Sequence, residues 1–76
     1  MKNYETTDLG LAATLVSYKY ALDNIDKNNP RKVVFHFRKD NAIDKIINGY
    51  WSNDITVNPQ LYFNAIKMLK NRIYSN

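Results

Sequence analysis

The sequence predicts a small α+β domain in which three helices pack against an antiparallel β-hairpin. Apolar residues recur at helical spacing near both ends of the chain and in its middle. Between the first two helical segments, residues 33–37 form an apolar run whose Val and Phe content is typical of a strand. A chain of 76 residues supports one hydrophobic core. We therefore expect residues 1–76 to form a single domain.

The first helix is expected to begin near Asp8, with Thr6 or Thr7 capping its free backbone amides. The apolar spacing ends near Ser17 to Lys19, where alternation takes over. The helix should therefore be largely buried and about ten residues long.

Two strands should follow, over residues 20–25 and 31–38, joined by a polar loop that ends at Pro30. Alternation along the second strand places Phe35 and Phe37 towards the core and their neighbours on the other face. A two-stranded hairpin is marginal alone, so helices should cover one of its faces. Pairing between two copies of the chain would extend the sheet, which makes a homodimer an expectation.

Two more helices are predicted after the hairpin. Asp40 should cap the first, whose apolar face is formed by Ile43, Ile46, Ile47 and Tyr50. Residues 55–57 read as a short edge strand or an extended connector. Asn58 and Pro59 then signal the start of the last helix. Its inner stripe is Tyr62, Ile66, Leu69 and Ile73, and a second stripe beside it is Phe63, Lys67, Lys70 and Tyr74.

Several classes of function are disfavoured by composition. The chain has no cysteine, one histidine and two glycines, which argues against thiolate chemistry, metal sites and phosphate-cradling glycine loops. No serine lies in a nucleophile-elbow context. We expect no enzyme activity, no metal and no cofactor. The polar start and the short apolar runs indicate neither a signal peptide nor a membrane span, so a cytoplasmic protein is expected.

A net charge of +4 favours a polyanionic partner, and nucleic acid is the first hypothesis. Basic residues concentrate around the hairpin loop and on the last helix, and His36 could stack on a base or contact phosphate. The predicted nucleic-acid-binding residues are Arg31, Lys32, His36, Arg38, Lys67 and Lys70.

A protein-interaction module, such as an inhibitor or adaptor that binds a host protein, is the alternative hypothesis. Ten of the 76 residues are aromatic, and aromatic side chains anchor protein interfaces. The predicted interface residues are Tyr18, Trp51, Phe63 and Tyr74.

Three stretches of the chain together resemble a family of small uncharacterised proteins from bacteria, archaea and their viruses. They are residues 4–13, which contain the opening E-T-T-D-L-x-L-A-A, residues 29–35, and residues 65–74, with Tyr50 and Trp51 between the last two. The resemblance covers nearly the whole chain. It implies an origin in a phage or mobile element and assigns no mechanism.

Overall fold

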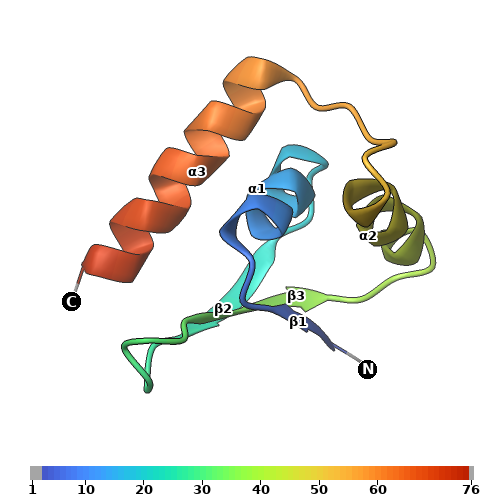
Figure 1. Cartoon of the computed structure of the whole chain (residues 1–76). Coiled ribbons are helices and arrows are strands. Elements are labelled where there is room, and N and C mark those ends of the chain that lie inside the picture. The colour runs from blue at the N-terminus through green and yellow to red at the C-terminus, as the bar shows by residue number, and fades with distance from the viewer. Residues whose placement is uncertain (1–2, 76) are drawn as a thin grey trace.

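The computed structural model describes residues 3–75 and has three helices and a three-stranded sheet (Figure 1). The elements are β1 (Asn3–Thr6), α1 (Leu9–Ser17), β2 (Leu22–Asp26), β3 (Val34–Arg38), α2 (Ile43–Trp51) and α3 (Pro59–Tyr74). The predicted α+β class and the predicted order of three helices and two hairpin strands are confirmed. Residues 54–58 form an extended connector rather than an edge strand.

Strand β1 is an addition to the predicted hairpin. The sheet order is β1-β3-β2 with both pairs antiparallel, so β3 is the central strand. Tyr4 of β1 pairs with Phe37, and Leu22 of β2 pairs with Phe37 from the other side. The β2–β3 pairing shifts register between Leu22 and Asn24, which places a bulge near the start of β2.

The core lies between one face of the sheet and the helices. Phe35 and Phe37 of β3 are fully buried on that face, as alternation predicted. Figure 1 shows α1 in the middle, between α2 and α3, above the sheet. Residues 11–15 of α1 are all buried, which is the pattern of a helix surrounded by protein. Ala65 and Leu69 of α3 complete the core against α1.

Local hydrogen bonds explain where the helices begin. Asp8, rather than a threonine, is the N-cap of α1, and its Oδ1 accepts from the Leu11 amide at 2.8 Å. Asn58 caps α3 as predicted, accepting from the Gln60 and Leu61 amides. Each carboxylate or amide oxygen satisfies donors that the first helical turn leaves free.

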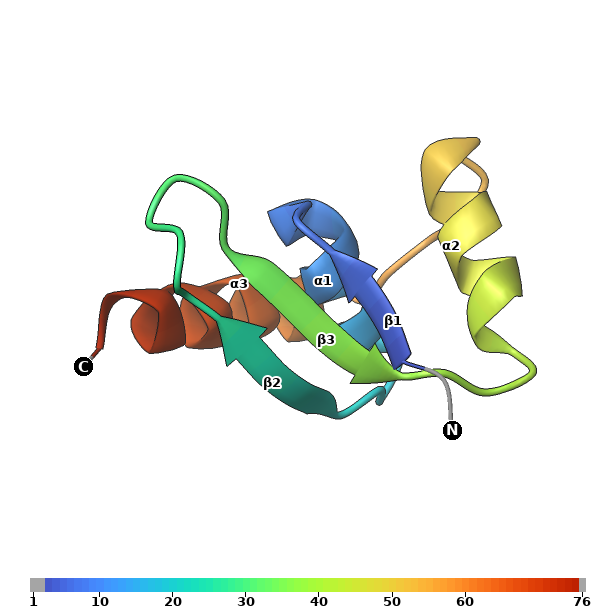
Figure 2. The ribbon, with the colours of Figure 1, turned by 90° about the horizontal axis from the view of Figure 1, so that it is seen from below.

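The other face of the sheet is not covered by helices. Figure 2, seen from below, shows the three strands in front of α1 and α3, with α2 to one side. His36 and Arg38 of β3 alternate with the buried phenylalanines and therefore belong to this open face.

Candidate nucleic-acid interface

The loop between β2 and β3 has a defined backbone at its tip. Asp26 Oδ1 accepts from the Asn28 amide at 2.9 Å, and Asn29 Oδ1 accepts from the Arg31 amide at 3.0 Å. The Lys32 amide donates to the Asn29 carbonyl at 3.0 Å. These Asx-type turns hold the backbone that presents the exposed Arg31 and Lys32 side chains.

A lysine connects this loop to the end of α3. Lys27 Nζ donates to the Arg72 carbonyl at 3.0 Å and to the Ser75 carbonyl at 2.7 Å. An ammonium group at this position satisfies carbonyls that the last turn leaves free and is attracted to the negative end of the helix dipole. Figures 1 and 2 both show the loop and the C-terminal end of α3 at the same end of the molecule.

The net positive charge of the chain is concentrated in these two segments. Residues 26–33 and 67–75 carry six basic residues and one acidic residue, whereas the rest of the chain carries five basic and six acidic residues. We call the six cations the basic end. They are Lys27, Arg31, Lys32, Lys67, Lys70 and Arg72.

Four of the six predicted nucleic-acid-binding residues belong to the basic end, and two do not. His36 lies in the middle of the open sheet face, where its Nδ1 is 3.6 Å from Glu5 Oε2. Asp26 flanks β3 on the same face, opposite Val34 in the register. The open face therefore carries carboxylates beside the histidine, and it is not a uniformly basic surface.

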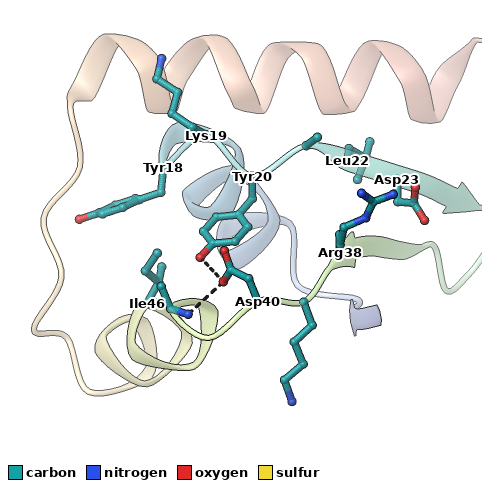
Figure 3. A pocket seen from close by; sticks show the side chains of 11 residues that line it. Tyr18, Lys19, Tyr20, Leu22, Asp23, Arg38, Asp40 and Ile46 are labelled. Carbon is teal, nitrogen blue, oxygen red and sulfur yellow. Dashed lines mark hydrogen bonds between the residues drawn. The ribbon is translucent and has the colours of Figure 1, made fainter. Parts of the chain in front are cut away.

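Arg38 lies at the far end of β3 from the hairpin loop, beside a hollow of about 820 Å³ between β2 and α2 (Figure 3). In Figure 3 its side chain extends towards β2, on the side of Asp23. The charged residues that line this hollow are of both signs. They are Lys19, Asp23, Arg38, Lys39 and Asp40.

Tyr20, which is half-buried, lines the same hollow. Tyr20 Oη donates to Asp40 Oδ1 at 2.7 Å, and that oxygen also accepts from the Ala42 and Ile43 amides at 3.0 Å each. The hydrogen bond from Tyr20 lowers the pKa of Asp40, with help from the two amides. Burial, together with the Asp40 carboxylate, raises the pKa of Tyr20 to about 12. The N-cap of α2 is Ala42, which makes no side-chain capping bond, so Asp40 is not the cap that the sequence predicted. Asp40 lies two residues earlier and holds the turn that leads into α2.

The predicted protein-interface residues come from the ends of α1 and α2 and from α3. Tyr18 is 38% exposed and its hydroxyl donates to the Thr56 carbonyl, so it bridges α1 to the connector. Trp51 is 60% exposed and packs edge-to-face on Tyr50 at 4.9 Å between ring centroids. Phe63 and Tyr74 are exposed on α3, on the same side as Lys67 and Lys70.

Sequence reasoning missed two features of this region. Leu61, which is 41% exposed on α3, was not among the predicted surface residues. The contact between Lys27 and α3 also had no sequence signal, because the two partners lie 45 and 48 residues apart.

Residues 3–75 contain neither a cluster of metal ligands nor a membrane-spanning helix. Within that range no group of three or more His, Asp or Glu side chains is placed to hold a metal ion. No helix within it is long and apolar enough to cross a bilayer.

Together, the fold and the site define a small α+β domain with one strongly basic end. Residues 1–75 match the family model described as Domain of unknown function (DUF5659), so the chain belongs to that family. The expected membership of an uncharacterised family is thus confirmed. No curated protein and no solved structure matches the chain.

Proposed function

We propose that this protein is a non-enzymatic nucleic-acid-binding protein that contacts phosphates through its basic end. The segregation of charge carries the proposal: the hairpin loop and the second half of α3 carry a net charge of +5, whereas the rest of the chain carries −1. A cluster of one sign attracts a polyanion more strongly than the same charges dispersed over the surface.

The hairpin contributes to this proposal by holding its cations outward. Arg31 and Lys32 are exposed, and the hydrogen bonds of the loop fix their backbone. Lys27 has a different role, since its ammonium group is engaged by two α3 carbonyls. Arg31, Lys32, Lys67 and Lys70, all exposed, are therefore the residues that we expect to reach phosphate oxygens.

The experiment compares two double variants that lower the net charge by the same amount. Arg31→Gln with Lys32→Gln removes two cations from the basic end, and Lys39→Gln with Lys45→Gln removes two near α2, at the other end of the molecule (Figure 1). Binding of labelled duplex and single-stranded oligonucleotides is followed by fluorescence anisotropy over a range of salt concentrations.

The first double variant should bind more weakly and should lower the slope of log K against log salt by about 1.4 to 1.8, since each phosphate contact contributes about 0.7 to 0.9. The second should keep the wild-type slope. If both double variants lost the same affinity, net charge alone would explain the binding, and a localised site would be contradicted. Flat titrations at low salt would exclude nucleic-acid binding.

A second candidate function is binding of a host protein through Trp51. This side chain is 60% exposed and borders a hollow of about 420 Å³ that Tyr50, Ile55 and Tyr62 also line. An exposed tryptophan beside a hollow has the composition of an interface hot spot. Trp51→Ala should abolish such an interaction and leave oligonucleotide binding unchanged.

We further propose that the protein is cytoplasmic, that a phage or mobile element encodes it, and that it forms a homodimer. Within residues 3–75, the outer edges of β1 and β2 have no strand partner, and an unpaired edge can accept a strand from a second copy. Sedimentation equilibrium should then give about twice the chain mass of 8.9 kDa. A mass equal to one chain would contradict the proposed dimer but would not affect the proposal of nucleic-acid binding.

A further inference from the structure

Two aromatic and two basic side chains form one exposed row along α3. Phe63, Lys67, Lys70 and Tyr74 are spaced i, i+4, i+7 and i+11, and all four are exposed. At 3.6 residues per turn they fall within an arc of about 60°, and at 1.5 Å per residue the row is roughly 16 Å long. We call these four residues the α3 row.

Contacts within the row join its two kinds of side chain. Lys67 Nζ lies 5.3 Å from the centroid of the Phe63 ring, over its face. The phenylalanine is still 60% exposed with the lysine in place, and Tyr74 is 80% exposed. Ring surface is therefore accessible at both ends of the row, with an ammonium group next to one ring and a second lysine between them.

We infer that the α3 row binds single-stranded nucleic acid, with bases stacked on Phe63 and Tyr74 and phosphates contacted by Lys67 and Lys70. This inference rests on the proposed function and names its substrate class. Aromatic side chains that alternate with cations are the usual means by which proteins hold an unpaired strand. The two rings lie too far apart for neighbouring stacked bases, which are about 3.4 Å apart, so other nucleotides separate the bases that they contact.

The row distinguishes a single strand from a duplex. In a duplex the base faces are already stacked on each other, and only base edges and the backbone are accessible without intercalation. The lysines of the row would contact either form, whereas the rings gain a partner only from a strand whose bases are unpaired.

Charge also favours a nucleic acid over an apolar protein surface at this site. The α3 row contains no acidic residue, and its two lysines, Lys67 and Lys70, belong to the basic end. A partner must therefore supply negative charge along roughly 16 Å of helix as well as flat rings. A single strand supplies both, and a protein partner would need acidic residues between its aromatic anchors.

The test uses the full chain and two matched double variants. Phe63→Leu with Tyr74→Leu keeps apolar side chains and removes both rings, and Phe63→Tyr with Tyr74→Phe keeps both rings. The probes are a labelled oligothymidylate of about 16 nucleotides, near the upper site size of small single-strand-binding domains, and a duplex of the same length. Thermal unfolding of each variant verifies that the fold is retained.

Loss of both rings should weaken single-strand binding at least tenfold, and duplex binding should change less than twofold. The ring-retaining variant should bind both probes like the wild type. If the leucine variant binds the single strand as tightly as the wild type does, while Lys67→Gln with Lys70→Gln weakens both probes, the inference is wrong and the proposed function stands. If the wild-type protein binds neither probe, the proposed function fails together with the inference.

Discussion

The phenol oxygen of Tyr50 donates a hydrogen bond of 2.8 Å to Asp8 Oδ1, the same oxygen that caps α1 by accepting from the Leu11 amide. One carboxylate therefore fixes the start of α1 and attaches the end of α2 to it, across 42 residues of sequence. Burial, reinforced by Asp8, raises the pKa of Tyr50 to about 12. The neutral phenol is the form that the folded protein requires.

The same device recurs at the start of α2. There Tyr20 donates to Asp40, which accepts from the amides of Ala42, the N-cap of α2, and of Ile43, its first residue. In both places an aspartate that accepts from backbone amides near the start of a helix also accepts a hydrogen bond from a tyrosine of another element. These contacts hold α2 in place beside α1, where few apolar residues of α2 are fully buried.

Removing the Tyr50 hydroxyl should measurably destabilise the fold. Tyr50→Phe leaves the Asp8 carboxylate with one donor fewer, and we expect the free energy of unfolding to fall by about 1.5 kcal/mol, the lower end for a bond to a charged group because the site is partly exposed. Chemical denaturation measures this change. Tyr74→Phe removes a hydroxyl from a side chain that is 80% exposed and should change stability by less than about 0.5 kcal/mol.

The two glycines should respond in opposite directions to the same substitution. A Cβ at Gly10 would lie 2.5 Å from Tyr50 Oη and 3.3 Å from Asp8 Oδ1, so Gly10→Ala should cost about 1–3 kcal/mol despite the better helix propensity of alanine. A Cβ at Gly49 would meet Ile55 Cβ at an ordinary 3.4 Å. Gly49→Ala should therefore stabilise the protein by about 0.5–1 kcal/mol. Two changes of the same sign would contradict the close packing around Gly10.

Lys19 occupies a position that favours glycine. Its φ is 75°, and the Tyr20 amide donates to the Leu15 carbonyl at 3.0 Å, which completes a Schellman-type end to α1. Relief of the left-handed strain exceeds the entropy that glycine adds to the unfolded chain, so Lys19→Gly should raise the free energy of unfolding by about 0.5–1 kcal/mol, and with it the melting temperature.

Two further variants separate this backbone effect from loss of charge. Lys19→Ala also removes the ammonium group but retains a Cβ, and it should give no such gain. Asn53 ends α2 in the same conformation, with a φ of 60°. Asn53→Gly should gain less than Lys19→Gly, because asparagine enters this region readily.

Stability should decline in alkali through the two bonded tyrosines. Their pKa is about 12 in the folded protein against 10.0 for an ordinary tyrosine. Between these values the unfolded chain releases phenol protons that the folded protein retains, so the stabilisation is complete below about pH 10 and is lost as the pH rises through about 12. Denaturation at a series of pH values tests this. The variant Tyr20→Phe with Tyr50→Phe should have a flatter alkaline limb than the wild type.

Lys27 should stabilise the end of α3 without being a main phosphate contact. Lys27→Met removes the ammonium group that two carbonyls share and should increase amide exchange in the last turn of α3, for a cost of about 0.3–1 kcal/mol. Oligonucleotide affinity should fall less than in the Arg31→Gln and Lys32→Gln variant. A larger loss of affinity from Lys27→Met would contradict the structural role assigned to it.

The helices could be predicted from sequence because their signals are local. The Asn58 cap followed by Pro59 marks the start of α3, and the spacing of Ile43 and Ile47 marks the buried face of α2. The Phe35 and Phe37 alternation likewise identified the buried face of β3. Caps and periodicity arise within a few residues of each other, so one stretch of chain contains the whole signal.

Strand β1 could not be predicted in the same way. Its sequence Asn-Tyr-Glu-Thr has a single large apolar side chain, Tyr4, and two exposed positions, Asn3 and Glu5. Such a segment becomes a strand because β3 offers it an unpaired edge, which is a property of the assembled sheet rather than of residues 3–6.

The three helices, the hairpin, the two basic clusters and the row of aromatic and basic residues on α3 could all be recognised in the sequence. The contact between the two clusters, through Lys27 and the end of α3, and the position of His36 beside Glu5 became visible only in the folded chain. This difference follows from the range of the interactions. Helical periodicity and capping act over a few residues, whereas the position of one charge relative to another depends on how distant segments pack around the shared core.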